Sequence, residues 1–393
     1  MVPGKSLPVT VLMISRLVYS MNWYNLSPAL VQISSEYDVT VNAAGLIFAF
    51  FLLGAGLFQV PAGILAARIG SRTNCIIGLS LMAVTGFASI FTNSFTSLLF
   101  LRFLSGMGAA FYFSSAVAVL NDIYPEKLGL MMGYYNAAFD IGGGIGIFGF
   151  TPITVVLGLK WNEIIQAILT AISALSLLIF IPKGDHVGNF EPGVLRKRIV
   201  NLKIWTLAIA FSGFWSTTYV FSEYMKTYAS FTGLPTYYAG ALGSSVLFFG
   251  ILGSFFSGRM KPENFIRSAV WMVIILAVSV MWIPFLGLPG MWASALIVGM
   301  LTVSISSLEY STVVFIENDR RYVALNSGLF NSIQILVGFA VVFSFTYILA
   351  RGFLFAWIVV GLIPCITIPL VLIYLREIRS SGIGILNVGK KIN

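Results

Sequence analysis

The stretch PKGDHVGNFEPGVLRKRIVN, residues 182–201, decides the architecture of this 393-residue chain. It combines proline, glycine and charge in one long polar run, whereas the residues on both sides of it form apolar runs with short connections. Over the whole chain 58% of residues are hydrophobic and 9% are charged, against roughly a quarter charged in soluble domains. The chain is therefore predicted to be a membrane protein that is divided into two halves at 182–201.

Apolar segments flank this stretch, six on each side. A helix that crosses a membrane needs about 20 predominantly apolar residues, and the twelve segments that approach or exceed this length are 7–31, 42–66, 74–93, 96–119, 130–156, 162–181, 202–228, 235–258, 266–285, 289–315, 322–349 and 353–375. We predict an all-α membrane protein of two pseudo-symmetric six-helix bundles: an N-terminal bundle (1–181), a linker (182–201) and a C-terminal bundle with a short tail (202–393). The first segment is expected to stay in the protein, because Arg16 interrupts it and no small-residue cleavage site follows it.

The basic residues are distributed unequally between the two sides of the membrane. Eighteen of the 23 lysines and arginines lie on the side of both termini, and three lie on or near the opposite side. By the positive-inside rule, both termini and the linker are predicted to be cytoplasmic in a multi-pass protein of the cell membrane. The net charge of +9 does not indicate nucleic-acid binding, because these residues are spread over loops that face anionic lipid. We expect the lipid bilayer as a partner, no nucleic acid, and a monomer.

An internal repeat relates the two halves. A shift of 195 residues aligns Ser27 with Ser222, and it superimposes two copies of the pattern G-x-x-N-x6-G, which are Gly133, Asn136 and Gly143 in the first half and Gly328, Asn331 and Gly338 in the second. One offset that holds over five segments indicates two parallel six-helix repeats. Such repeats place a solute site at their interface near the membrane midplane.

The chain lacks the residue clusters that enzyme and metal sites need. His186 is the only histidine, and Cys75 and Cys365 lie far apart, which argues against zinc sites, disulfide scaffolds and histidine-based triads. No G-x4-G-K-[ST] pattern supports an ATP-driven pump, and the glycine run 142–146 lies inside an apolar segment without the strand that a dinucleotide site requires. We expect no enzyme activity, no catalytic residue, no metal and no cofactor.

The loop after the second segment reads Gly63-Ile-Leu-Ala-Ala-Arg68-Ile-Gly70-Ser-Arg72. It resembles the motif G-x-L-x-D-R-x-G-R of the major facilitator superfamily, although Ala67 stands where the family has its acid and Ser71 is inserted before Arg72. The resemblance implies that Gly63, Arg68, Gly70 and Arg72 form a gating loop between conformations.

Two further motifs carry the same resemblance, which covers essentially the whole chain. In the fourth segment, Arg102-Phe-Leu-Ser-Gly106-Met-Gly108-Ala-Ala110 is similar to the family motif R-x-x-q-G-x-G-a-a, whose arginine is often linked to proton coupling. In the fifth, Gly133-x8-Gly142-x3-Gly146 resembles the start of the antiporter motif G-x8-G-x3-G-P-x2-G-G, with Ile147 in the place of the proline. The resemblance implies the superfamily's fold and transport by alternating access.

Five ionisable side chains are predicted to lie within the segments, namely Arg16, Arg102, Asp140, Glu223 and Glu309. At a helix centre each costs about 2.5–3.5 kcal/mol on insertion scales, so all five are candidates for proton coupling or charge pairing. Arg16 and Asp140 lie roughly 14–15 Å from the cytoplasmic edge at 1.5 Å per residue, where they could form an ion pair. The pair either opens when a proton or an anionic solute takes one partner, or it is a permanent bridge that fixes helix packing.

The other three ionisable residues also have alternatives. Arg102, roughly 9 Å from the outer edge, either functions there or extends toward water. Glu223 lies one turn before Lys226, so the alternative to a functional acid is a surface pair. Glu309 has no basic neighbour within a helical turn, which suits a proton carrier.

Polar and aromatic residues at helical spacing are candidates for the lining of a solute cavity. They are Tyr19, Trp23, Asn136, Trp215, Tyr219, Tyr310, Asn331 and Gln334. The alternatives are plain packing or interfacial anchoring for the aromatic residues, and hydrogen bonding between helices for the amides. Gly142 and Gly146 form a small-xxx-small face that allows two helices to approach closely.

Three functions compete. The first is a secondary active transporter for a small polar organic solute, driven by protons, and the arginines favour an organic anion. The second is a proton-driven exporter of drugs or lipophilic cations, which the aromatic richness and the partial antiporter motif favour. Against it stand the missing proline and the lack of an acid on the first segment. The third, a membrane receptor or an intramembrane enzyme, lacks a soluble domain and a nucleophile with its base. We predict the first.

Overall fold

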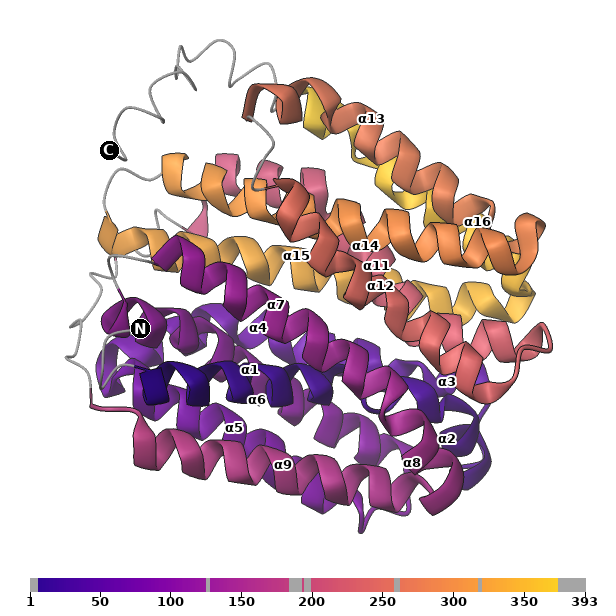
Figure 1. The fold of residues 1–393 in the computed structure, drawn as a ribbon, viewed down its shortest axis with the longest axis horizontal. Coiled ribbons are helices and arrows are strands. Elements are labelled where there is room, and N and C mark those ends of the chain that lie inside the picture. Colours follow the sequence, from indigo (N-terminus) through magenta and orange to yellow (C-terminus); the bar gives the residue numbers. More distant parts are fainter. Residues whose placement is uncertain are drawn as a thin grey trace.

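The computed structural model describes residues 6–124, 128–183, 193, 199–257, 262–316 and 320–373. Side chains are described for these residues except 114, 128–130, 254–257, 262–267, 307–316, 320–325 and 327. All regular secondary structure in these ranges is helical, and the long helices run side by side along one direction (Figure 1). Each of the twelve predicted segments coincides with one helix or with consecutive helices of the described chain.

The first half consists of α1 (Ser6–Tyr24), η1 (Ser27–Ala29), α2 (Leu30–Glu36), α3 (Val41–Ala44), α4 (Leu46–Ile69), α5 (Ser71–Ser89), α6 (Phe95–Ile123), α7 (Leu128–Phe148), α8 (Phe150–Leu157) and α9 (Leu159–Phe180). The second half consists of α11 (Leu202–Phe231), α12 (Thr236–Ser257), α13 (Pro262–Met281), α14 (Ile283–Ile316), α15 (Arg320–Ile348), η3 (Leu349–Arg351) and α16 (Phe353–Ile366). A kink at Gly287, where φ is 57°, interrupts the helical geometry of α14.

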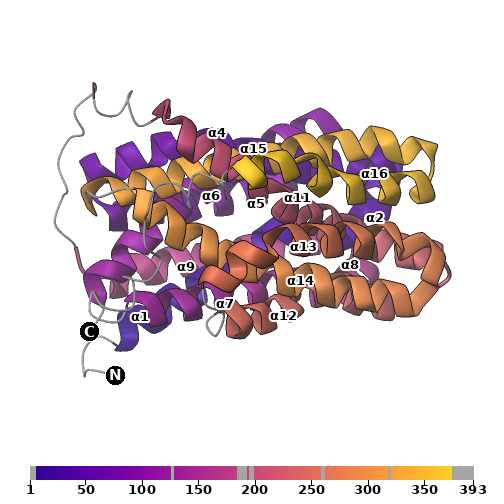
Figure 2. The same cartoon turned by 90° about the horizontal axis from the view of Figure 1, so that it is seen from above.

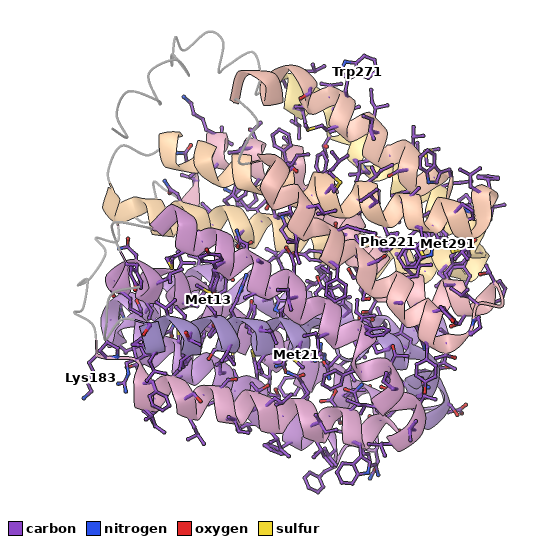
Figure 3. All side chains as sticks on the ribbon, viewed as in Figure 1. Met13, Met21, Lys183, Phe221, Trp271 and Met291 are labelled. Atoms are coloured by element: carbon purple, nitrogen blue, oxygen red, sulfur yellow. The ribbon has the colours of Figure 1, made fainter. Side chains whose placement is uncertain are left out.

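Among the described residues, nine helical segments are long and apolar enough to cross a membrane. They contain α4, α6, α7, α9, α11, α12, α14, α15 and α16. The predicted segments at α1, α5 and α13 are helices at the expected positions. Side chains fill the space between helices, as at the buried Phe221, while Trp271 points outward from α13 (Figure 3). An apolar exterior of this kind is what a helix bundle in lipid requires.

The two halves lie next to each other, with the first half in indigo and magenta and the second in pink to yellow (Figure 1). They meet where α4 packs on α15 and where α7 packs on α12. Helix α11 lies in the interior, where it packs on α12, α14, α15 and α16 (Figure 2). We call the end of the bundle at which α11 turns into α12, and which also carries α2, the far end.

Residues that are related by the 195-residue offset in the sequence make equivalent contacts in the structure. A Cβ atom built on Gly143 of α7 would lie 2.7 Å from Leu247 and 2.9 Å from the ring of Tyr24. A Cβ atom built on Gly338 of α15 would lie 2.6 Å from the ring of Tyr219 and 4.0 Å from Leu52. The 195-residue offset relates Tyr24 to Tyr219, and it relates Leu52 to Leu247. The α7–α12 and α4–α15 contacts are therefore equivalent, as two pseudo-symmetric bundles require.

Tight crossings inside each half repeat in the same way. A Cβ atom on Gly106 of α6 would lie 2.0 Å from the carbonyl oxygen of Phe51 on α4. A Cβ atom on Gly299 of α14 would lie 2.1 Å from the carbonyl oxygen of Val246 on α12. Phe51 and Val246 are again related by the 195-residue offset, whereas the two glycines are 193 residues apart. Glycine at these points lets helix backbones touch, which is how helices associate in lipid.

Candidate functional site

A group of buried aromatic rings lies between the two halves. We call it the central aromatic cluster, and it comprises Tyr19, Trp23, Phe51, Tyr112, Phe139 and Tyr219. Ring centroids are 4.8 Å apart for Tyr19 and Tyr112 and 5.0 Å apart for Trp23 and Phe51. Trp23 also lies 6.1 Å from Tyr219 of the second half. The predicted cavity residues Tyr19 and Trp23 therefore face this interface, because residues four apart share one face of a helix.

Arg16 projects into aromatic rings beside this cluster. Its guanidinium carbon lies 4.2 Å from the ring centroid of Tyr135, 4.5 Å from that of Phe139 and 4.8 Å from that of Tyr19. The residue is 4% exposed, and its Nε and Nη1 have no hydrogen-bond partner among the described residues. Ring faces attract a cation but accept few hydrogen bonds. The guanidinium therefore retains donors that an oxyanion can use.

Asp140 follows Phe139 on α7 and is equally buried, at 3% exposed. Its carboxylate lies 3.4 Å from the position that a Cβ on Gly250 would take, so it faces α12 of the second half. Its Oδ2 has no hydrogen-bond partner among the described residues. The ion pair expected between Arg16 and Asp140 is absent from the described part of the structure. The two residues were predicted to lie at similar depths in the membrane, but the side chain of Arg16 points toward the aromatic rings and not toward Asp140.

Glycines hold α1 and α7 in direct contact around these two residues. A Cβ on Gly142 would lie 2.1 Å from the carbonyl oxygen of Leu17, and a Cβ on Gly146 would lie 3.0 Å from that of Met21. Ser20 on α1 donates a hydrogen bond of 2.6 Å to the carbonyl oxygen of Phe139. This is the close helix approach that the small-xxx-small spacing predicts. It fixes Arg16 and Asp140 relative to each other.

Arg102 on α6 is buried at the other side of α1. Its Nη2 donates a hydrogen bond of 3.1 Å to the carbonyl oxygen of Asn22, and its guanidinium carbon lies 4.7 Å from the ring centroid of Phe51. The residue is 5% exposed, so it does not extend toward water. Arg102 supports the helix that carries Arg16, Tyr19 and Trp23.

Side-chain amides join α1 to α9 along a row that we call the polar seam. It comprises Asn22, Asn25, Asn162, Gln166 and Thr170. Asn22 donates to the Thr170 hydroxyl at 2.7 Å, while Asn25 and Asn162 exchange hydrogen bonds of 2.9 and 2.8 Å. None of these residues was among the site residues predicted from the sequence. They could have been found from the side-chain amides at helical spacing in the first and sixth apolar segments, because polar residues within apolar segments commonly form hydrogen bonds between helices.

Buried polar contacts close the far end between the two halves. The hydroxyl of Ser27 donates to the Glu223 carboxylate, and Nζ of Lys226 donates to the carbonyl oxygen of Pro28 at 2.9 Å. We call these four residues the far-end latch. Glu223 and Lys226 are 1% and 4% exposed. The surface pair considered for them is therefore wrong: both are buried, and each bonds to η1 of the first half.

The remaining candidates of the second half lie near the interface with the first half. Trp215 is half-buried and stacks at 5.7 Å on Tyr219. On α15, Asn331 is half-buried and Gln334 is buried, and Asn136 on α7 of the first half is also half-buried. Helix α14 runs through 309 and 310, but the side chains of Glu309 and Tyr310 lie outside the described residues.

The predicted gating loop contacts its own half. Gly70 ends α4 with a φ of 89°, a conformation that favours glycine, and this lets α5 begin directly. Arg72 donates a hydrogen bond to the carbonyl oxygen of Leu178 on α9, while Arg68 is exposed and no described atom lies within 4 Å of a Cβ built on Gly63. The loop thus ties α5 to α9.

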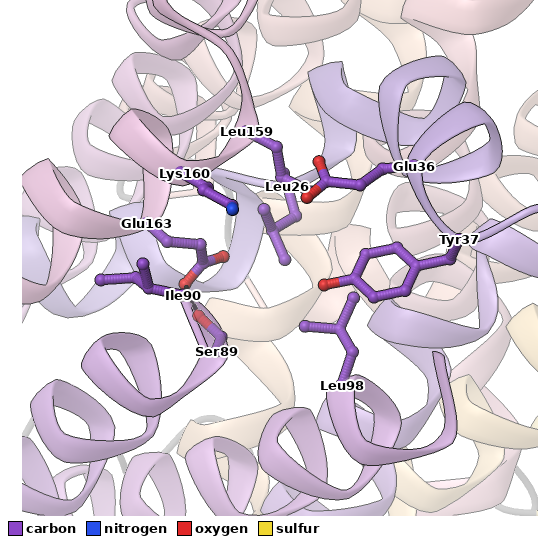
Figure 4. A pocket seen from close by; sticks show the side chains of 9 residues that line it. All are labelled: Leu26, Glu36, Tyr37, Ser89, Ile90, Leu98, Leu159, Lys160 and Glu163. Carbon is purple, nitrogen blue, oxygen red and sulfur yellow. Dashed lines mark hydrogen bonds between the residues drawn. The ribbon is translucent and has the colours of Figure 1, made fainter. Parts of the chain in front are cut away.

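One further buried acid, Glu163 on α9, was not selected from the sequence. It is 6% exposed and lines a pocket at the far end together with Tyr37, Ser89 and Lys160 (Figure 4). Burial raises the pKa of Tyr37, whose hydroxyl lies 2.9 Å from the hydroxyl of Thr92. Glu163 stands at the second position of the predicted segment 162–181 beside basic and aromatic residues, a pattern typical of a membrane interface. Its burial comes from packing against α1 and α5, which no spacing rule supplies.

A family profile described as the Major Facilitator Superfamily matches residues 12–342. The chain is similar to a probable L-galactonate transporter of Escherichia coli, with 27% identity over 42% of this chain and 36% of that protein. It is 26% identical to protein spinster homolog 3 of Homo sapiens over 41% of this chain and 32% of that protein. It is 26% identical to the quinolone resistance protein NorA of Staphylococcus aureus over 47% and 50%, respectively. The matched stretches thus span between a third and a half of these relatives.

Proposed function

The chain belongs to the major facilitator superfamily of transporters, and from this premise we propose that it moves a small organic anion across the cytoplasmic membrane by alternating access, together with protons. The observation that carries the proposal is the buried Arg16 guanidinium, whose Nε and Nη1 have no partner among the described residues. It lies beside the central aromatic cluster, which reaches Tyr219 of the second half, and transporters built from two such repeats bind their solutes between the repeats.

The surroundings of Arg16 favour a carboxylate that also carries hydroxyl groups. Guanidinium groups bind carboxylates through two parallel hydrogen bonds. Trp23 lies within the central aromatic cluster, and its indole Nε1 has no acceptor among the described residues. That donor suits a hydroxyl or carbonyl oxygen, and the ring faces suit the carbon skeleton. The relative from Escherichia coli is named for L-galactonate, an anion of this chemistry.

Asp140 is the proposed proton carrier. An anion at Arg16 would lie close to a second buried negative charge on α7, and burying two like charges is unfavourable. A proton on Asp140 removes that repulsion, so solute and proton bind together more readily than either binds alone. Coupling of this kind requires only that the two ligands prefer the same state of the protein.

The far end is proposed to face the outside of the cell. Basic residues concentrate on the side of both termini, and the positive-inside rule places that side in the cytoplasm. The far-end latch then closes the outer side in the described state. Opening the latch while the termini side closes would complete alternating access.

Export of drugs or lipophilic cations is the second candidate. The central aromatic cluster and Asp140 are suited to a cation, and one relative is named as a quinolone resistance protein. Two buried arginines beside the same cluster oppose it, because they repel a cation. The anion is therefore the preferred substrate class.

Proteoliposomes that contain a pH-sensitive dye test the proposal. Wild type is challenged with L-galactonate, with an uncharged hexose and with tetraphenylphosphonium, and it is compared with Arg16→Gln and Asp140→Asn. We expect proton influx with L-galactonate only, loss of transport in Arg16→Gln, and transport without proton influx in Asp140→Asn. Lys203→Gln, which removes an exposed cation on α11, serves as the control. Proton movement driven by tetraphenylphosphonium and unaffected by Arg16→Gln would favour the exporter instead.

A further inference from the structure

The pocket beside Glu163 is separate from the central aromatic cluster. It lies at the far end, between α2, α5, α6 and α9, and its empty volume of about 280 Å³ includes open solvent at the rim. Figure 4 shows the carboxylates of Glu36 and Glu163, the Tyr37 hydroxyl and the Lys160 amine directed into it. Glu36 and Lys160 are exposed, so the pocket connects to water at its rim and ends at Glu163.

Glu163 lies at the buried end of this pocket, and its two carboxylate oxygens differ in their hydrogen bonding. One, Oε2, accepts a hydrogen bond of 3.0 Å from the Ser89 hydroxyl. The other, Oε1, is buried without a hydrogen-bond partner among the described residues. The side chain of Asn25, which directly follows α1, lies beside the carboxylate. A buried carboxylate oxygen that accepts no hydrogen bond is unfavourable unless a hydrogen is added.

Charged and titratable groups face Glu163 from several elements. Arg102 of α6 acts on it electrostatically, and Asn25 and Ser89 are the uncharged neighbours from α1 and α5. Glu36 and Tyr37 face it across the pocket from α2, and Lys160 faces it from its own helix. No hydrogen bond joins Glu163 to Arg102 or to Lys160 among the described side chains. The carboxylate is thus near cations but is not neutralised by direct pairing.

We propose that this pocket is a proton-binding site that is open at the far end, with Glu163 Oε1 as the acceptor. A hydronium ion in the water at the pocket rim transfers its proton to Oε1: one O–H bond of hydronium breaks, one O–H bond forms on Glu163, and a water molecule is left. The added proton removes the unpaired negative charge of the buried carboxylate. The inference rests on the proposed function in one respect, because it assigns to Glu163 the external loading of the coupled proton.

The polar seam connects this site to the solute site. Asn162 and Gln166, on the same helix as Glu163, bond to Asn25, which directly follows α1, and to Val18 of α1. Arg102 responds to the charge of Glu163 and holds the Asn22 carbonyl of α1. Protonation removes the negative charge that faces Arg102. Protonation of Glu163 therefore changes the interactions that hold α1, the helix that carries Arg16 and Trp23.

Infrared difference spectra of the purified protein during a pH titration test proton binding without any solute. We expect a carbonyl band of a protonated carboxylic acid in wild type that is lost in Glu163→Gln and retained in Asp38→Asn, an exposed acid outside the pocket. Ser89→Ala keeps the acid but removes its donor, so it should retain the band and change the titration midpoint. Identical spectra for wild type and Glu163→Gln would overturn the proposal. If Glu163→Gln does not fold, an unchanged midpoint in Ser89→Ala would overturn it.

Proteoliposomes then separate this proposal from the proposed function. L-galactonate uptake is measured at several external pH values, and exchange of L-galactonate is measured without a pH gradient. We expect Glu163→Gln to exchange L-galactonate but to lose the dependence of uptake on external pH. Unchanged pH dependence in Glu163→Gln would reject the role of Glu163 and leave proton coupling intact. A wild type that moves no protons with L-galactonate would reject the proposed coupling, and the infrared band would still decide whether Glu163 binds protons.

Discussion

The hydroxyl of Ser27 donates a hydrogen bond to the carboxylate of Glu223, and this bond joins η1 of the first half to α11 of the second. One turn further along α11, Lys226 bonds to the carbonyl oxygen of Pro28. Both contacts are buried. Movement of the halves apart at the far end must break both, and each involves a charged group, for which hydrogen bonds are strongest.

Glu223→Gln should favour opening of the far end. Gln keeps an oxygen that accepts from Ser27 but removes the charge. Hydrogen bonds to charged groups contribute about 1.5–3 kcal/mol, against about 0.5–1.5 kcal/mol for neutral ones, so the open fraction should rise roughly fivefold to tenfold. Labelling of Ala29→Cys by an impermeant maleimide, in a background that lacks Cys75 and Cys365, reports the opening because Ala29 is buried in η1. Asp38→Asn is the control, and equal labelling rates in Glu223→Gln and the control would contradict the latch.

Arg16→Lys should weaken solute binding although it preserves the charge. Lysine cannot form the two parallel hydrogen bonds of a guanidinium, and loss of one charged bond corresponds to about a tenfold higher KM. Thermal stability should not fall, because Arg16 has no carboxylate partner among the described residues whose pairing would be lost. KM for L-galactonate and the Tm in detergent are the measurements. A normal KM would remove Arg16 from the solute site.

Gly338→Ala should slow transport, whereas Gly328→Ala should not. The new methyl group would lie 2.6 Å from the ring of Tyr219 at position 338, but no described atom lies within 4 Å at position 328. Overpacking of this kind costs about 1–3 kcal/mol. Initial uptake rates in proteoliposomes compare the two variants. Equal rates would mean that the α4–α15 interface tolerates displacement of Tyr219.

Asn162→Ala should destabilise the first half. The side chain of Asn162 bonds to Asn25 and to the Thr154 hydroxyl, and it is fully buried. Its loss should lower the free energy of unfolding by about 1–3 kcal/mol, because its partners stay buried and unpaired. Thermal unfolding in detergent measures this, with Ser176→Ala on the exposed side of α9 as the control. An unchanged Tm for Asn162→Ala would show that the polar seam is not stabilising.

The helices and their pseudo-symmetry could be predicted from the sequence because both depend on local patterns. A run of apolar residues determines where a helix lies in a bilayer. The equivalence of Gly143 and Gly338 was visible as a constant offset, and both glycines occupy matching contacts. Gly142 and Gly146 were predicted to form one face that lets a second helix approach, because residues at a spacing of four share one face of a helix; the structure identifies the second helix as α1.

The contacts of the ionisable residues could not be predicted in the same way. Spacing along a helix gives the depth of a residue, but not which neighbouring helix its side chain meets. Arg16 and Asp140 were placed at one depth, yet Arg16 contacts aromatic rings. Glu223 and Lys226 share a helix face, yet each bonds to η1. A long side chain can reach several neighbouring helices, and which of them it contacts depends on how the helices pack.

The polar seam has a consequence for how the protein is made. Asn22, Asn25, Asn162 and Thr170 all belong to the first half, so their hydrogen bonds can form as soon as α9 has left the ribosome. Lys226 and Glu223 belong to the second half, but the bonds described for them go to Pro28 and Ser27 of the first. Synthesis from the N-terminus therefore supplies the acceptor of Lys226 and the donor of Glu223 before either charge has to be buried. The first bundle provides the surface on which the second completes its folding.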